Sequence, residues 1–166
     1  MYRIRKIVSA FTLVGIVFHE FGHKIFCDLT GVRIYKVCYY RFGNPPGYVI
    51  HERPKNFFQS FFISIGPFLT GTLMSLLFFR ISCSFTAGQW QKYFFIWLGA
   101  SIAFHSFPSS ADAKGLWNAT NRHVGRNLLA IVGYPFALLI WIANALLFFW
   151  FDLGYAILLF FLSGSV

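Results

Sequence analysis

The stretch HEFGH at positions 19–23 places two histidines and a glutamate inside an apolar segment, IVSAFTLVGIVFHEFGHKIFC. On a helix, His19 and His23 are four residues apart, so both imidazoles project from one face, roughly 6 Å apart at their Cβ atoms. This spacing suits two ligands of one tetrahedral zinc ion, and Glu20 is then placed to act as a general base on a zinc-activated water. Ionisable residues are costly in a membrane and are usually functional there. The motif therefore predicts zinc-dependent hydrolysis.

A catalytic zinc ion has three protein ligands and one open position, so a third ligand must come from elsewhere in the chain. The candidates are His51, His105, Asp112 and His123. We favour Asp112, which lies in HSFPSSADAKGLW, because Pro108 cannot continue a helix and Ser109 or Ser110 can cap a new one. Asp112 would follow a membrane span that runs in the same direction as the span holding HEFGH, so both would reach the same side of the membrane.

The composition indicates that most of the chain is solvated by lipid. Of its 166 residues, 57% are hydrophobic and 11% are charged, whereas about a quarter of a soluble domain is charged. We therefore expect an all-α integral membrane protein. The net charge of +9 comes from residues scattered between apolar runs; this distribution favours contact with anionic lipid over nucleic acid, for which no motif is present. Cys27, Cys38 and Cys83 show no metal or disulfide spacing, and we expect reduced packing residues.

Four segments are long and apolar enough, or nearly so, to be transmembrane helices, within a single membrane-embedded domain over 1–166. They are residues 7–27, 57–80, 92–107 and 128–151. The N-terminal MYRIRK and the apolar run after it mimic a signal peptide, but we expect a retained first span. The tail YAILLFFL, within 153–162, either continues the fourth helix or forms a separate re-entrant or interfacial piece.

A β-hairpin is predicted between the first two spans, over residues 32–53. Residues rich in Val, Ile and Tyr precede the turn NPPG, and a second short run, YVIHE, follows it. This is the composition of two strands around a tight turn. Because lipid cannot pair with exposed strand edges, the hairpin should lie at the membrane interface or against the helices.

Taken together, these motifs resemble the site-2 protease family of intramembrane zinc metalloproteases. The resemblance rests on HEFGH, the hairpin-like segment, SIGPFLTGTL in the second span and Asp112 after the third, over residues 7 to about 115. It implies a three-helix catalytic core, zinc held by His19, His23 and Asp112, and cleavage of peptide bonds in transmembrane or membrane-associated proteins.

Two motifs depart from the family pattern. The family's Asn-Pro-Asp-Gly is SSADA at 109–113 here, and its Gly-Pro-x-x-Asn is GPFLT at 66–70, so an Asn often assigned to substrate or oxyanion contact is missing. Thr70, Thr72 or His105 could donate a hydrogen bond in its place, and His51 is a further auxiliary candidate. We also expect an orienting partner for each imidazole, with Asp28, Thr72 and Ser106 as candidates.

The basic residues also predict which side the site faces. Nine of the 14 Lys and Arg residues lie around the segments that follow the first and third spans, and five at the N-terminus and between the second and third spans. This bias favours a multi-pass protein with its active site towards the cytoplasm.

Two other functions are compatible with the sequence, and a third is less so. The zinc could serve hydrolysis of a lipid-linked substrate, or the chain could be a non-catalytic membrane scaffold that retains the metal site. A zinc transporter would need several liganding groups along a pathway, whereas one cluster is present here.

Overall fold

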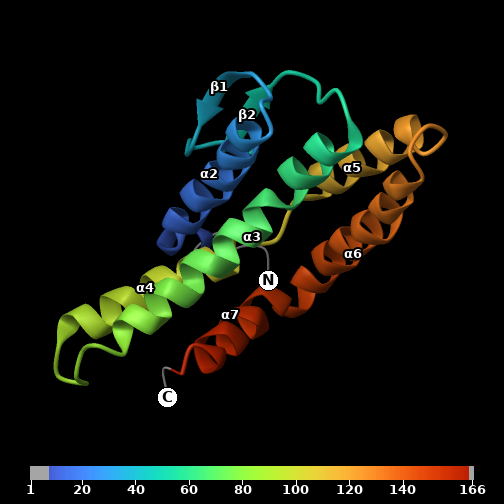
Figure 1. Cartoon of the computed structure of the whole chain (residues 1–166). Helices are drawn as coiled ribbons and strands as arrows, with labels where there is room; N and C mark the ends of the chain where they lie inside the picture. The colour runs from blue at the N-terminus through green and yellow to red at the C-terminus, as the bar shows by residue number, and fades with distance from the viewer. Residues whose placement is uncertain (1–7, 165–166) are drawn as a thin grey trace.

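The computed structural model describes residues 8–164, which form a mostly helical chain with one small sheet (Figure 1). The α-helices are α2 (Leu13–Leu29), α3 (Phe57–Ser82), α4 (Trp90–Phe104), α5 (Ser110–His123), α6 (Gly133–Leu146) and α7 (Phe151–Leu162). The strands are β1 (Ile34–Cys38) and β2 (Tyr48–His51), and two short 3₁₀ helices, η1 (Leu128–Val132) and η2 (Leu147–Phe149), flank α6. Figure 1 shows α3 paired with α4, α5 beside α6, and the hairpin at the C-terminal end of α2.

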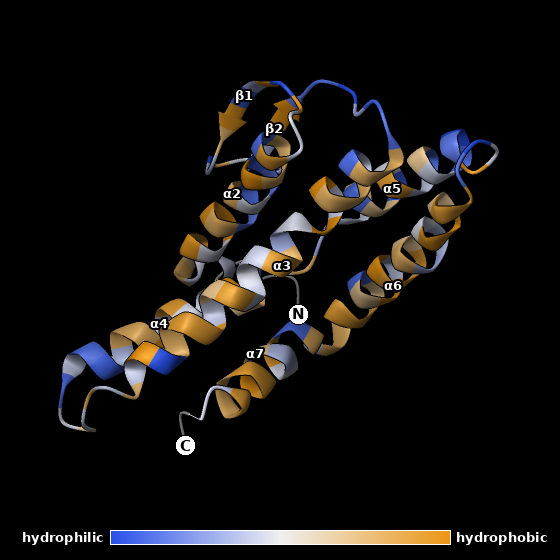
Figure 2. Ribbon diagram, in the orientation of Figure 1, coloured by the Kyte–Doolittle hydropathy of each residue, from blue (hydrophilic) through white to orange (hydrophobic). Residues whose placement is uncertain are grey.

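Two helical segments are long and apolar enough to cross a membrane, namely α3 and the continuous run Leu128–Phe149. Within residues 8–164 no other helix meets both criteria, since α2 has 17 residues and α4 has 15, against about 20 for a typical span. The four-span arrangement therefore stays a prediction. Figure 2 shows apolar residues along α3, α4, α6 and α7, with polar residues gathered at the α3–α4 turn and around the hairpin and the end of α5.

The C-terminal tail is a separate helix. Trp150 has a left-handed backbone, with φ 60° and ψ 34°, and this residue ends the helical run through α6 and η2. The chain then starts again as α7, which buries Ala156 and Leu159 against Phe79 of α3 and Ala103 of α4. The helix predicted to end at 151 thus ends two residues earlier, and the tail returns to pack on the helical core.

The predicted hairpin is present. Strands β1 and β2 are antiparallel, with Cys38 opposite Tyr48 and Ile34 opposite His51, and an irregularity follows Ile34. The sheet contacts α2, so it lies against the helices as expected.

Close packing of α2 fixes the position of HEFGH. A side chain at Gly22 would come within 2.7 Å of Pro67 Cα in α3, and one at Gly15 would collide with the Ser101 carbonyl of α4. Only glycine allows backbones to approach this closely. The two contacts lie on either side of His19, and they set the height and rotation of the motif relative to α3 and α4.

Candidate metal centre

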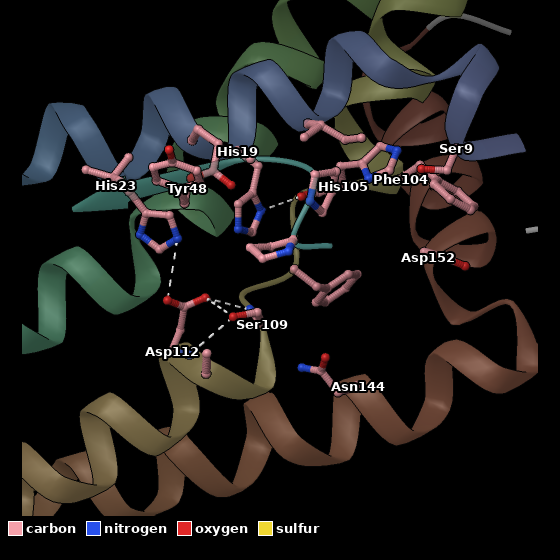
Figure 3. Close-up of a pocket in the computed structure, with 18 of the residues that line it drawn as sticks. Ser9, His19, His23, Tyr48, Phe104, His105, Ser109, Asp112, Asn144 and Asp152 are labelled. Atoms are coloured by element: carbon pink, nitrogen blue, oxygen red, sulfur yellow. Dashed lines mark hydrogen bonds and ion pairs between the residues drawn. The ribbon is translucent and has the colours of Figure 1, made fainter. Parts of the chain in front are cut away.

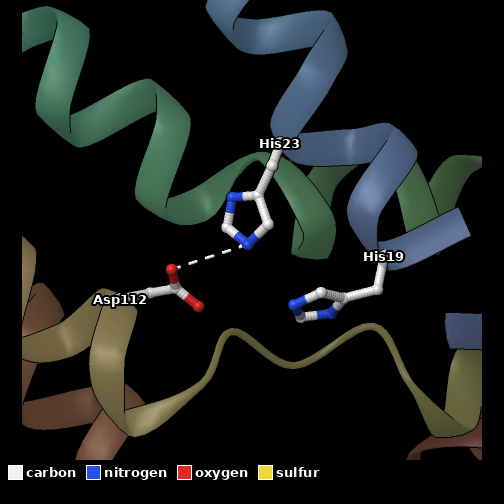
Figure 4. Close-up of side chains that lie close together, drawn as sticks. All are labelled: His19, His23 and Asp112. Atoms are coloured by element: carbon white, nitrogen blue, oxygen red, sulfur yellow. Dashed lines mark ion pairs between the residues drawn. The ribbon is translucent and has the colours of Figure 1, made fainter. Parts of the chain in front are cut away.

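His19, His23 and Asp112 lie together and form a possible metal-binding triad (Figure 4). One ligand atom from each residue lies within 4.8 Å of the other two. The two imidazoles project from consecutive turns of α2, with ring centroids 5.0 Å apart. Asp112 approaches from the first turn of α5, and its Oδ1 is 3.5 Å from His23 Nε2. Residues 89 positions apart are thus brought to one point.

The hydrogen bonds of the imidazoles identify the nitrogens that face the triad. His19 Nδ1 donates to the His105 carbonyl oxygen at 2.8 Å, and His23 Nδ1 donates to the Ile63 carbonyl oxygen at 2.9 Å. A carbonyl oxygen only accepts, so each Nδ1 carries a proton. In the neutral ring, Nε2 then has a free lone pair, which is the form that binds a metal.

The proline in α3 explains why the Ile63 carbonyl is available. In a helix, the carbonyl of residue 63 would accept from the backbone N–H of residue 67. Residue 67 is proline, which has no N–H. The Ile63 oxygen therefore lacks its helical partner and accepts from His23 instead. Pro67 is buried and packs against Gly22, the residue before His23, so this donor and acceptor meet where α2 and α3 are closely packed.

Asp112 is positioned by the cap of its own helix. Ser109, one of the two serines predicted to cap this helix, is the N-cap of α5, and its hydroxyl accepts from the Asp112 N–H. In return, Asp112 Oδ2 accepts from the Ser109 N–H at 2.7 Å and from its hydroxyl at 2.6 Å. This reciprocal capping box turns the carboxylate back along the helix axis. Its second oxygen, Oδ1, is left facing His23 (Figure 4).

A positive charge is needed between His23 Nε2 and Asp112 Oδ1, because both are acceptors when the imidazole is neutral. A proton on His23 is one solution. A separation of 3.5 Å is long for a hydrogen bond.

A metal ion is the other solution. Zinc bonds nitrogen and oxygen at about 2.0–2.2 Å, so two of its tetrahedral ligands lie roughly 3.4 Å apart, close to the 3.5 Å between His23 and Asp112. The donor set of two neutral imidazoles and one carboxylate is one that zinc accepts, although other divalent metals accept it too. These residues therefore fit a metal ion.

Glu20 lies beside the triad under the tip of the hairpin. Its side chain is 8% exposed and lines the same cavity as the triad. A methyl group on Gly47 would come within 2.6 Å of Glu20 Cγ and 2.8 Å of its Oε1. The hairpin turn thus lies directly over the carboxylate, and only a residue without a side chain leaves room for it.

The triad opens into a cavity of about 650 Å³ (Figure 3), a size that suits a small ligand or a short piece of peptide. Its walls come from α2, the hairpin turn and β2, the segment between α4 and α5, and the α6–α7 corner. The polar residues that line it are Ser9, His19, Glu20, His23, Tyr48, His51, His105, Ser109, Asp112, Asn144 and Asp152.

The three histidines that were also predicted as candidate ligands lie outside the triad. His51 and His105 line the cavity, but neither side chain belongs to the triad. His105 Nε2 is 2.9 Å from the Thr12 hydroxyl, which itself donates to the Val8 carbonyl. His123 bonds the carbonyls of Ala119 and Lys55 at the far end of α5.

Thr70 does not line this cavity. Its hydroxyl donates to the Gly66 carbonyl within α3 and packs against Gly22.

The side chains predicted to orient the two imidazoles were wrong. Asp28 pairs with Lys24, the Thr72 hydroxyl bonds Tyr155, and Ser106 donates to the Ile102 carbonyl. Backbone carbonyls orient both imidazoles instead. The position of Pro67, four residues after Ile63, was the available signal for one of them.

Sequence reasoning also missed Asn144, which reaches the cavity from α6 (Figure 3). A single carboxamide in the apolar helix GYPFALLIWIANAL was the signal for it.

No protein-family model, curated protein or solved structure matches this chain. The possible metal centre is therefore supported by the chain's own geometry, and the family resemblance of its motifs stays a prediction.

Proposed function

We propose that this chain is an intramembrane zinc metalloprotease that hydrolyses peptide bonds of membrane-embedded proteins. The observation that carries the proposal is the convergence of two imidazole Nε2 atoms and one carboxylate oxygen on one point, with both Nδ1 atoms tied to carbonyls. The resemblance to site-2 proteases supports the same reading, and the cavity provides room for an extended peptide segment.

The residues of this chain would act in defined roles. When bound, zinc would lower the pKa of a water molecule towards 7 and polarise the substrate carbonyl. Glu20 accepts the proton from the attacking water and returns it to the leaving amine. His19, His23 and Asp112 would hold the ion, and the hairpin tip at Gly47 restricts the space available to the Glu20 carboxylate.

We further propose a multi-pass arrangement with the triad inside the membrane. Large aliphatic side chains are exposed along the outer faces of the helices, including Leu73 at 64%, Leu139 at 59% and Ile142 at 55%. Contiguous apolar surface of this kind is rare on soluble monomers and suits contact with lipid. In this arrangement α2 and α4 are short spans, which a locally thinned bilayer or flanking helical residues would accommodate.

Strand β2 offers a way to hold an extended substrate. Tyr48, Val49 and His51 of β2 line the cavity, and β2 pairs only with β1 among the strands of residues 8–164. We propose that its second edge pairs with the substrate backbone. Proline substitutions along β2 should then raise KM while the protein remains folded. Unchanged cleavage of a defined substrate by such variants would contradict this part of the proposal.

The experiment that tests the function uses the purified full chain in lipid vesicles. The probe is a labelled single-span peptide with glycine and proline in its middle, and products are identified by mass spectrometry. Cleavage should require zinc and stop on addition of a chelator. Glu20→Gln should retain the metal and lose cleavage, because it removes only the base. Cleavage by Glu20→Gln at the wild-type rate would refute the assigned mechanism.

The same preparation distinguishes the other functions. Chelator-sensitive release of products from a membrane lipid extract, with no peptide cleaved, would identify hydrolysis of a lipid-linked substrate. A scaffold would retain its cellular phenotype in Glu20→Gln, whereas an enzyme would lose it.

We propose that the triad faces the cytoplasmic side, and the single cysteine at the α3–α4 turn allows a test. Cys83 is exposed and lies at the opposite end of α3 from the hairpin. In intact cells, a membrane-impermeant maleimide should label Cys83 but should not label a cysteine introduced by Gly43→Cys in the hairpin turn. The reverse pattern would place the triad on the outer side.

A further inference from the structure

Asn144 is the only carboxamide in helix α6, and it contacts the segment that leads to the third ligand. Its Nδ2 donates to the Pro108 carbonyl at 2.9 Å and to the Ile140 carbonyl at 2.8 Å. Both partners are acceptors, so the amide nitrogen must face them. The Ile140 contact lies one turn back in the same helix, and the Pro108 contact joins α6 to the segment between α4 and α5.

Three hydrogen-bonded contacts of that segment, residues 105–109, join it to α2, α6 and α5, and two of these contacts involve a triad residue. The His105 carbonyl accepts from His19 Nδ1, the Pro108 carbonyl accepts from Asn144, and Ser109 forms the reciprocal cap with Asp112. Asp112 is only four positions after Pro108. A shift of the Pro108 peptide would therefore move the His105 carbonyl, which orients His19, and the backbone of Asp112.

Removing the Asn144 donor would leave the carbonyl of the buried Pro108 without this partner, and an unsatisfied buried polar group typically costs about 1–3 kcal/mol. The segment would relieve that cost by moving, because it lies in a coil between two helices.

From this geometry we propose that Asn144 is a positioning residue for the metal centre, acting through the Pro108 carbonyl. Helix α6 then belongs to the catalytic unit, together with α2 and α5, which carry the triad. This inference rests on the proposed metal site, but it is independent of which bond the enzyme cleaves.

The test compares metal affinity in Asn144→Leu and wild type, using the full chain, Zn²⁺ competition against a chromophoric chelator, and the absorption spectrum of the Co²⁺-loaded protein. We expect a loss of affinity of about 10–100-fold in Asn144→Leu, as for other residues that orient metal ligands. The Co²⁺ bands should also shift, because the His19 and Asp112 ligands are reoriented. Asn144→Ser, which is polar but too short to reach Pro108, provides a milder second variant and should change both readouts in the same direction.

Asn121→Leu is the matched control. Asn121 accepts a 2.7 Å hydrogen bond from the Tyr134 hydroxyl, so the same substitution removes an α5–α6 contact remote from residues 105–109. The zinc affinity and Co²⁺ spectrum of Asn121→Leu should equal those of wild type. Equal affinities in the Asn144 variants and Asn121→Leu would overturn the proposal. If wild type binds zinc but cleaves no peptide, the protease function fails while the comparison still decides the role of Asn144.

Discussion

Replacing Pro67 by alanine should weaken metal binding without weakening the fold. The substitution gives α3 a backbone N–H four residues after Ile63, directed at the carbonyl that now accepts from His23 Nδ1 at 2.9 Å. The new N–H competes for this acceptor and draws the Ile63 peptide back into a regular helix. His23 then loses the contact that fixes its ring and directs Nε2 to the triad.

Metal affinity should fall, whereas the stability of the metal-free fold should stay the same or rise. Losing an orienting partner typically costs about tenfold or more in metal affinity, or about 1.4 kcal/mol. Helix α3 gains a hydrogen bond and replaces proline, the least favourable interior residue, with alanine, the most favourable. Thermal unfolding of the metal-free protein should therefore occur at the same or a higher temperature, while the zinc dissociation constant rises.

The assay is zinc competition against a chelator on the purified full chain, with Pro135→Ala as the matched control. Pro135 lies in the first turn of α6 and does not line the cavity. Its replacement should leave zinc affinity unchanged. Equal zinc affinity in Pro67→Ala and Pro135→Ala, at either the wild-type or a reduced level, would refute the role assigned to the Ile63 carbonyl.

Two further substitutions separate the parts of the site. Ser109→Ala removes the cap of α5 and one hydrogen bond to Asp112. The free energy of unfolding should fall by about 1 kcal/mol, and zinc affinity should fall as well. Unchanged zinc affinity in competition titrations would contradict the role of the cap. Gly47→Ala should displace the Glu20 carboxylate and lower kcat while zinc content stays at the wild-type level. Gly43→Ala, in the same turn but with no atom closer than 3.5 Å to the added methyl, should leave kcat unchanged, and an equal loss in both would count against a specific contact.

The sequence was most informative where local rules decide the geometry. The four-residue spacing of His19 and His23 places both rings on one helical face, and Ser109 with Asp112 forms a capping box that can be read from the sequence. The hairpin was predictable from its β-branched strands and Pro-Gly turn.

Contacts that depend on how helices cross could not be predicted in the same way. Polar side chains were expected to orient the imidazoles, whereas the carbonyls of His105 and Ile63 do so, and only the second had a sequence signal, Pro67. Asn144 reaches the site only because the chain turns back after α5 and lays α6 beside it. The end of the fourth helix was also misjudged, since the left-handed conformation of Trp150 is unusual for a large side chain.

The most direct test of the central claim is the zinc content of the purified chain, measured by mass spectrometry of the metal in wild type and in His19→Ala, His23→Ala and Asp112→Ala. We predict one zinc ion per wild-type chain and a large loss of bound zinc in each variant, with His51→Ala retaining the metal. Full zinc content in Asp112→Ala, or no zinc in the folded wild type, would contradict the assignment of this triad as a metal centre.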